Sequence, residues 1–242
     1  MMRITIRHYE CFEHLSSFMD GYLNTARNWD LLRLSDDNSP YGMPTDRRLW
    51  EKKCFESVEI RKRAKAIVDF MSNRFGRVNS YGAGCACLEY CLLKSNPKLE
   101  LYLSDFTPKT IEKLKSVFVG AKEIRIFDIL KDPWEGSQDN ALELFYRIDT
   151  EFTDEEWKSI FRRMQKAGVS NILFIPAQIL TCTEILRQTL RYIYRKVQGR
   201  QLTLAGYLRT ESQLKSLFEG GYDLEGANAI GGLKGYLLRL KK

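Results

Sequence analysis

Twelve residues in the first half of the chain combine glycines and cysteines at spacings that could support three kinds of site. The stretch reads SYGAGCACLEYC and covers residues 80–91. Gly82 and Gly84 could form a tight turn around a nucleotide. The cysteines could bind a metal, or the stretch could be a plain turn that opens a buried helix. These alternatives need different residues elsewhere in the chain.

A nucleotide site also needs a group that binds the ribose, and Asp105 could supply it. Where a strand ends in Gly-x-Gly and a helix follows, the glycines let the backbone approach a ligand and the helix N-terminus offers free N–H groups. Asp105 lies 21 residues after Gly84, at the end of the next apolar run. A carboxylate there can accept hydrogen bonds from ribose hydroxyls. The pair favours a nucleotide site over a plain turn.

The cysteines do not have the spacing of a metal site. Cys85-x-Cys87-x3-Cys91 lacks the paired CxxC arrangement of zinc sites, and no histidine lies nearby in the sequence. Cys87 and Cys91 are four residues apart and would share one helix face. We predict that they pack against a sheet as small apolar side chains, and we predict no metal site.

The sequence predicts a helix over 56–75. Beyond residue 76, short apolar runs alternate with helical patterns. The expected strands are VNSYGAG (78–84), LELYLSD (99–105), EIRIFD (123–128), ALELFYRI (141–148), NILFIPA (171–177), QLTLAGYL (201–208), YDLEGANAI (222–230) and GYLLRLKK (235–242). Strands alternating with helices predict an α/β, doubly wound, mostly parallel sheet. The last two strands have only a short glycine turn between them, which predicts an antiparallel end.

Residues 1–55 have a different texture. They hold both histidines, His8 and His14, and the turn-rich stretch SDDNSPYGMPTD. We interpret them as short helices separated by a long loop. The expected organisation is an N-terminal helical cap or lid over 1–55 and a core domain over 56–242.

The segment 56–242 resembles class I S-adenosylmethionine-dependent methyltransferases. VNSYGAG matches the family's first strand and glycine loop, and Asp105 in YLSDFTP its acidic residue after the second strand. Asp128 in IRIFDIL matches the acid after the third strand. YLRTESQLKSLFEGGYDLEG is similar to the arginine-bearing turn and penultimate helix, and GYLLRLKK to the antiparallel last strand. The resemblance implies a Rossmann-like, seven-stranded sheet.

It also implies S-adenosylmethionine as cofactor and S-adenosylhomocysteine as product. The implied cofactor-binding residues are Ser80, Tyr81, Gly82, Ala83, Gly84, Asp105, Phe106, Asp128 and Ile129. Asp105 would hold the ribose, and Asp128 would receive the adenine amino group while Phe106 packs on the ring. The chain departs from the family at Ser80, where an acid is usual, and at Ala86, where the loop usually has a glycine.

Methyl transfer from an activated donor depends mainly on holding donor and acceptor in line, and it needs a base only for a weakly nucleophilic acceptor. The sequence therefore assigns no catalytic residue firmly. Candidates are Tyr146, Arg147 and Asp149 after the fourth expected strand, and His14 in the cap. Asp149 could equally be the N-cap of the helix that follows.

Two other functions remain open. A nicotinamide-dependent (NAD(P)) oxidoreductase would share the glycine turn and the ribose acid, and Tyr192-x3-Lys196 mimics the catalytic pair of short-chain dehydrogenases. Its third loop glycine is absent, however. The second alternative is a non-catalytic, methyltransferase-like binding subunit, which Ser80 and the exit of the fourth strand would suit.

The acceptor is expected to be a small molecule. The motifs of amino-methylating and cytosine-methylating nucleic-acid enzymes are absent after the fourth strand. The net charge of +7 and the shared helix face of Arg187, Arg191 and Arg195 leave RNA or protein substrates open. No apolar run is long enough to span a bilayer, and no secretory signal is recognised. The expected setting is the cytoplasm with reduced cysteines; the oligomeric state is not predicted.

Overall fold

The computed structural model describes residues 3–12, 21–34, 41–71, 74–137 and 140–241, and it contains two sheets. The larger sheet has the order β4-β3-β2-β5-β6-β10-β9. Its strands are β2 (Arg77–Tyr81), β3 (Glu100–Asp105), β4 (Glu123–Ile126), β5 (Ala141–Tyr146), β6 (Asn171–Ile175), β9 (Tyr222–Ile230) and β10 (Leu233–Leu240). Neighbouring strands are parallel along β4-β3-β2-β5-β6. The predicted seven-stranded, mostly parallel sheet is confirmed.

The end of the sheet is antiparallel, as the glycine turn predicts. β10 runs antiparallel to both β6 and β9. Ile230 pairs with Leu233, so two residues form the turn, and these are Gly231 at φ +52° and Gly232 at φ +90°. A two-residue type I′ hairpin turn matches the twist of its strands and needs a positive φ at both central residues. Glycine adopts this conformation without strain.

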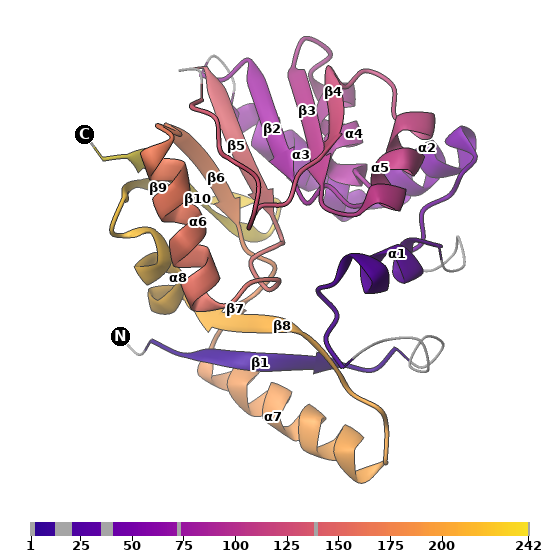
Figure 1. Cartoon of the computed structure of the whole chain (residues 1–242), viewed down its shortest axis with the longest axis vertical. Coiled ribbons are helices and arrows are strands. Elements are labelled where there is room, and N and C mark those ends of the chain that lie inside the picture. The colour runs from indigo at the N-terminus through magenta and orange to yellow at the C-terminus, as the bar shows by residue number, and fades with distance from the viewer. Residues whose placement is uncertain (1–2, 13–20, 35–40, 72–73, 138–139, 242) are drawn as a thin grey trace.

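Helices cover both faces of the large sheet (Figure 1). On one face lie α3 (Val58–Met71), α4 (Cys87–Ser95) and α5 (Pro108–Val117); on the other lie α6 (Asp154–Lys166) and α8 (Glu211–Phe218). Each face has its own apolar cluster, and the central strands β5 and β6 are buried almost throughout. Because these strands are buried on both faces, their sequences are nearly continuous apolar runs.

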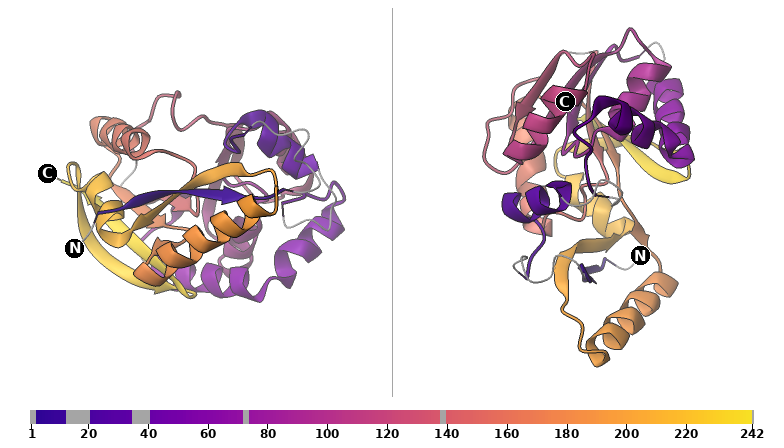
Figure 2. Two further views of the ribbon diagram at one scale, coloured as in Figure 1. Left: turned by 90° about the horizontal axis from the view of Figure 1, so that it is seen from below. Right: turned by 90° about the vertical axis from the view of Figure 1, so that its right-hand side faces the viewer.

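The N-terminal segment begins with a strand, which corrects the expectation of helices alone. β1 (Thr5–Glu10) pairs antiparallel with β8 (Thr203–Thr210), and β8 pairs with the two-residue β7 (Ile179–Leu180). This small sheet crosses below the large one in Figure 1 and is seen along its length in Figure 2. β1 lies about 200 residues from its partner, so local sequence patterns cannot show the pairing.

The described residues form three further helices: α1 (Ala26–Leu34), α2 (Arg47–Glu56) and α7 (Cys182–Val197). α2 packs on α4 of the core through Trp50 and Cys54, both almost fully buried. The Cys54 and Cys87 sulfurs are 2.7 Å apart, and the Trp50 indole N–H donates to the backbone oxygen of Cys85 at 2.9 Å. The N-terminal segment is thus joined to the core at the start of α4, where the glycine loop ends.

Candidate functional site

A cavity of about 430 Å³ lies between the carboxyl ends of the large sheet's strands and the N-terminal segment. The core contributes the loops after β2, β3 and β5, and the N-terminal segment contributes residues of β1 and α1. Carboxyl ends of parallel strands are where open α/β sheets bind ligands, because the loops there diverge around a crevice.

The glycine loop forms one wall of this cavity. Gly82 and Gly84 have φ values of +65° and +56°, which favour glycine. A Cβ at residue 82 would lie 2.8 Å from the Cγ2 atom of Ile148, and one at residue 84 would lie 2.5 Å from the Nη2 atom of Arg33. Both positions therefore favour glycine by conformation, and at residue 82 a Cβ would also collide with the branched Ile148 side chain.

Asp105 lies beside the loop at the end of β3 and is almost buried. Its Oδ2 atom accepts from the Gly84 N–H at 2.9 Å, and its Oδ1 atom accepts from the backbone N–H and hydroxyl of Thr107 at 3.0 and 2.7 Å. These bonds hold the carboxylate at the cavity wall. Each carboxylate oxygen can accept more than one hydrogen bond, so the bonds within the chain do not exhaust its capacity to accept.

Six of the nine predicted cofactor residues line the cavity. They are Gly82, Ala83, Gly84, Asp105, Phe106 and Ile129. Asp128 is not among the lining residues; its carboxylate accepts from the Leu130 N–H at 3.0 Å and pairs with Lys131 at 2.8 Å. The first two predicted residues, Ser80 and Tyr81, point elsewhere too.

The side chain of Ser80 points to α4, where its hydroxyl donates to Glu89 Oε1 at 2.6 Å. Glu89 is 2% exposed, and burial raises its pKa to about 7, partly offset by this hydrogen bond. An acid thus does stand at this point of the fold, on the helix instead of the strand. Tyr81 lies on the other sheet face, and its hydroxyl donates to Glu143 Oε2 at 2.9 Å.

The catalytic candidates separate into three groups. Tyr146 and Arg147 line the cavity; the Tyr146 hydroxyl accepts from Arg63 at 3.0 Å, and Arg147 has a positive φ of +59°. Asp149 is buried outside the lining, and its Oδ1 atom accepts from the Ala177 N–H at 2.6 Å. It does not cap α6, because Thr153 does so. His14 lies outside the described residues.

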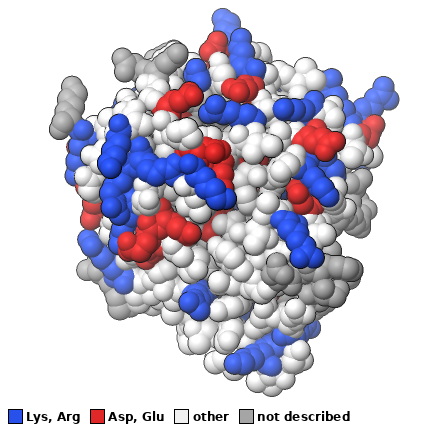
Figure 3. Space-filling view, viewed as in Figure 1, with Lys and Arg blue, Asp and Glu red and all other residues white. Residues whose placement is uncertain are grey.

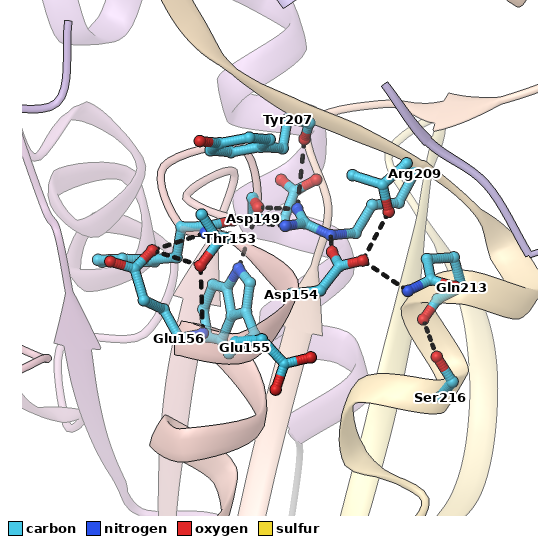
Figure 4. A network of polar contacts seen from close by, with 12 residues as sticks. Asp149, Thr153, Asp154, Glu155, Glu156, Tyr207, Arg209, Gln213 and Ser216 are labelled. Atoms are coloured by element: carbon cyan, nitrogen blue, oxygen red, sulfur yellow. Dashed lines mark hydrogen bonds and ion pairs between the residues drawn. The ribbon is translucent and has the colours of Figure 1, made fainter. Parts of the chain in front are cut away.

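The loop between β5 and α6 is held by Arg209, from the arginine-bearing turn noted in the sequence (Figure 4). This guanidinium is fully buried. It donates to the backbone oxygens of Asp149 and Phe152 and pairs with Asp154 at 2.6 Å. Because β8 carries Arg209, the small sheet determines where the loop after β5 lies.

Several cavity residues were not singled out from the sequence. They are Glu10, Phe12, Trp29, Arg33, Tyr41 and Glu151; His8, one of the two histidines of the chain, lines the cavity with them. Arg33 donates to the Tyr41 backbone oxygen at 3.0 Å, and its guanidinium lies 5.0 Å from the centre of the Trp29 ring. No motif marks these positions, since each depends on how the N-terminal segment folds over the loop.

The arginine face of α7 is largely paired within the chain. Arg191 and Arg195 contact Glu10 of β1 at 3.3 and 2.9 Å, and Arg187 contacts Glu184 at 2.6 Å. On the face seen in Figure 3, basic and acidic side chains are intermingled. Neither observation singles out a phosphate-binding surface.

Comparisons with solved structures identify the fold. The structure superposes on human N-acetylserotonin methyltransferase in complex with SAM (TM-score 0.61, 18% identity, 96% of this chain and 67% of that one). It also superposes on the mitomycin 7-O-methyltransferase (0.59, 19%, 88% and 60%) and on a riboflavin-derivative dimethyltransferase from Streptomyces davawensis (0.53, 18%, 74% and 53%). The chain thus spans about half to two thirds of these proteins.

No family model and no curated protein sequence matches the chain. The superpositions show the fold of class I S-adenosylmethionine-dependent methyltransferases. In the described part of the chain, no helix is long and apolar enough to cross a membrane. The same residues contain no group of three or more side chains placed to hold a metal ion.

Proposed function

We propose that the protein transfers a methyl group from S-adenosylmethionine to a small-molecule acceptor. The observation that carries the proposal is the cavity in which the glycine loop and Asp105 meet at the carboxyl ends of β2 and β3. The structural neighbours named as methyltransferases of N-acetylserotonin, mitomycin and a riboflavin derivative support a small acceptor.

The cavity residues fit an adenosyl cofactor at both ends. The positive φ values of Gly82 and Gly84 shape the loop along the cavity wall, and Asp105 offers acceptor oxygens to ribose hydroxyls. Beside Gly84, the Arg33 guanidinium is suited to the carboxylate of the methionyl end. The adenine contact of Asp128 stays a prediction, and it requires the carboxylate to turn from Lys131.

When bound, S-adenosylmethionine supplies a methyl group already activated by its sulfonium charge. The chain's own contribution is to hold donor and acceptor in line and to exclude water. We propose that residues 1–55 form a lid that excludes water, and that residues 56–242 form the cofactor-binding core. Phe12, Trp29 and Tyr41 of this lid line the cavity opposite the core. We place the reaction in the cytoplasm, as the sequence predicts.

Isothermal titration with S-adenosylmethionine, S-adenosylhomocysteine and NAD⁺ tests the proposal. Both adenosyl ligands should bind, and Asp105→Ala should weaken them by about 30- to 150-fold, which corresponds to the loss of a charge-assisted bidentate contact of about 2–3 kcal/mol. Glu112→Ala, a carboxylate on α5 outside the cavity lining, is the control. NAD⁺ binding that depends on Asp105, without adenosyl binding, would favour the oxidoreductase. Binding without turnover on any acceptor would favour the non-catalytic subunit.

A further inference from the structure

Glu151 lies in the cavity on a backbone that is held from two sides. Its backbone oxygen accepts from the Tyr22 hydroxyl at 3.2 Å and from Asn24 Nδ2 at 2.7 Å, both in the N-terminal segment. Arg209 binds the carbonyl groups of Asp149 and Phe152 on either side. The side chain is therefore placed by the fold and lines the same cavity as the glycine loop and Asp105.

The carboxyl group of Glu151 is only partly satisfied. Its Oε2 atom is shielded from solvent and has no hydrogen-bond partner among the described residues. An unsatisfied buried polar group costs about 1–3 kcal/mol. A ligand in the cavity that Glu151 lines can supply the missing partner.

Its surroundings hold the carboxyl close to the neutral range. Burial raises the pKa of Glu151 to about 8; the Trp29 hydrogen bond and the Arg33 charge oppose this rise, and Asp149 and Asp105 add to it. Burial raises the pKa of the Tyr22 and Tyr41 hydroxyls, and the charge of Glu151 adds to the rise. A pKa near the working pH suits a group that accepts and returns a proton.

We propose that Glu151 Oε2 accepts the hydrogen bond of an O–H or N–H group on the acceptor and takes its proton during transfer. This inference rests on the proposed function. The acceptor heteroatom forms the new bond to the methyl carbon, and the methyl–sulfur bond breaks with its electron pair left on sulfur. The proton passes to Oε2 and then to solvent. The Phe12, Trp29 and Tyr41 rings on the cavity wall indicate a phenol or arylamine as the acceptor.

Proton release on ligand binding tests the position of Glu151 without any acceptor. A sulfonium charge that enters the cavity favours the ionised carboxyl, whereas the neutral sulfur of S-adenosylhomocysteine does not. Titrations at pH 7 in buffers of different ionisation enthalpy should show about half to one more proton released with S-adenosylmethionine. Glu151→Gln should abolish the difference, and Glu155→Gln, an exposed glutamate on α6, should keep it.

Equal proton release by the two ligands in the unmodified protein would overturn the proposal, and this measurement does not require any variant to fold. A protein that binds neither ligand would instead refute the proposed function itself. The two failures are therefore distinguishable.

The acceptor class is tested on protein saturated with S-adenosylhomocysteine. 2-Naphthol should bind about 2- to 13-fold more tightly than 2-methoxynaphthalene, because only the naphthol donates a hydrogen bond to the carboxyl, which is largely neutral without the sulfonium charge. Glu151→Ala should remove this preference. Equal affinities, or no binding of either compound at millimolar concentration, would overturn the aromatic O–H acceptor.

Discussion

Arg33 is an unusual neighbour for a glycine loop because it comes from the N-terminal segment. Its guanidinium donates to the Tyr41 backbone oxygen and to the Cys85 sulfur at 3.4 Å, so it is held against the loop before any ligand arrives. Under the proposed function, a cation in this position contacts the amino-acid end of the cofactor and not its adenosine end.

Arg33→Met should therefore weaken S-adenosylhomocysteine and spare 5′-methylthioadenosine, which lacks the carboxylate. The expected loss is about 10- to 150-fold, the value of one hydrogen-bonded charge contact. Competition calorimetry of both ligands measures it. Arg48→Met, an exposed arginine on α2, is the matched control. Equal weakening of the two ligands would show that Arg33 only supports the loop.

Glu89 predicts an unusual dependence of stability on pH. Its pKa is about 7 in the folded protein against 4.5 in the unfolded chain, mainly because of burial. The folded state therefore binds this proton more tightly, so the contribution of Glu89 to stability is greatest below about pH 4.5 and is lost as the pH rises through 7. At 1.4 kcal/mol per pKa unit, the decline from this residue approaches about 3 kcal/mol.

Urea unfolding at pH 5 and pH 8 measures this decline. Glu89→Gln keeps an oxygen that can accept from Ser80, and it should lose less stability between the two pH values than the unmodified protein. Part of the slope should remain, since burial also raises the pKa of Asp149 to about 6 and that of Glu151 to about 8. An unchanged slope in the variant would mean that Glu89 stays ionised.

At the scale of elements, Gly206 of β8 packs directly against the backbone of the loop after β5. A Cβ on Gly206 would lie 2.2 Å from the backbone oxygen of Thr150, and φ there is +133°. Gly199 also has a positive φ, of +68°, but it has open space around it. A substitution at residue 199 therefore causes conformational strain alone, whereas one at residue 206 causes both strain and a steric collision.

Gly206→Ala should lower the free energy of unfolding by more than about 3 kcal/mol, and Gly199→Ala by about 1 kcal/mol. Because residue 206 presses on the loop that carries Glu151, its variant should also lose ligand affinity. Denaturant titration and calorimetry check both effects. Similar, small losses in the two variants would show that β8 can move away from the loop.

Local patterns predicted the elements of the large sheet because each one is periodic within its own sequence. The glycine loop, Asp105 and the last hairpin follow from short motifs for the same reason. β1 could not be predicted in this way, since its partner lies near residue 205, and neither could the positions of Arg33 and Glu151. Asp149 shows the limit of spacing: an acid before a helix suggested a cap, while Thr153 with Glu156 forms it.

At the scale of the whole molecule, the proposed lid is also part of the fold. Trp50 and Cys54 are 1% and 0% exposed and belong to the same apolar cluster as α3 and α4. A chain that begins at Val58 exposes this cluster and the edge of β8. We expect it to aggregate on expression, as measured by soluble fraction and sedimentation. A soluble, folded fragment would show that 1–55 is an independent cap.

The pairing of β1 with β8 has a consequence for synthesis. A ribosome that adds about 5–20 residues per second completes β8 roughly 10–40 s after β1 has emerged, because about 200 residues separate them. During that interval the growing chain carries a strand with no partner and a cavity that lacks one wall. Ligand binding should therefore be absent from nascent chains stalled before residue 203, even when all of the glycine loop and Asp105 have left the ribosome.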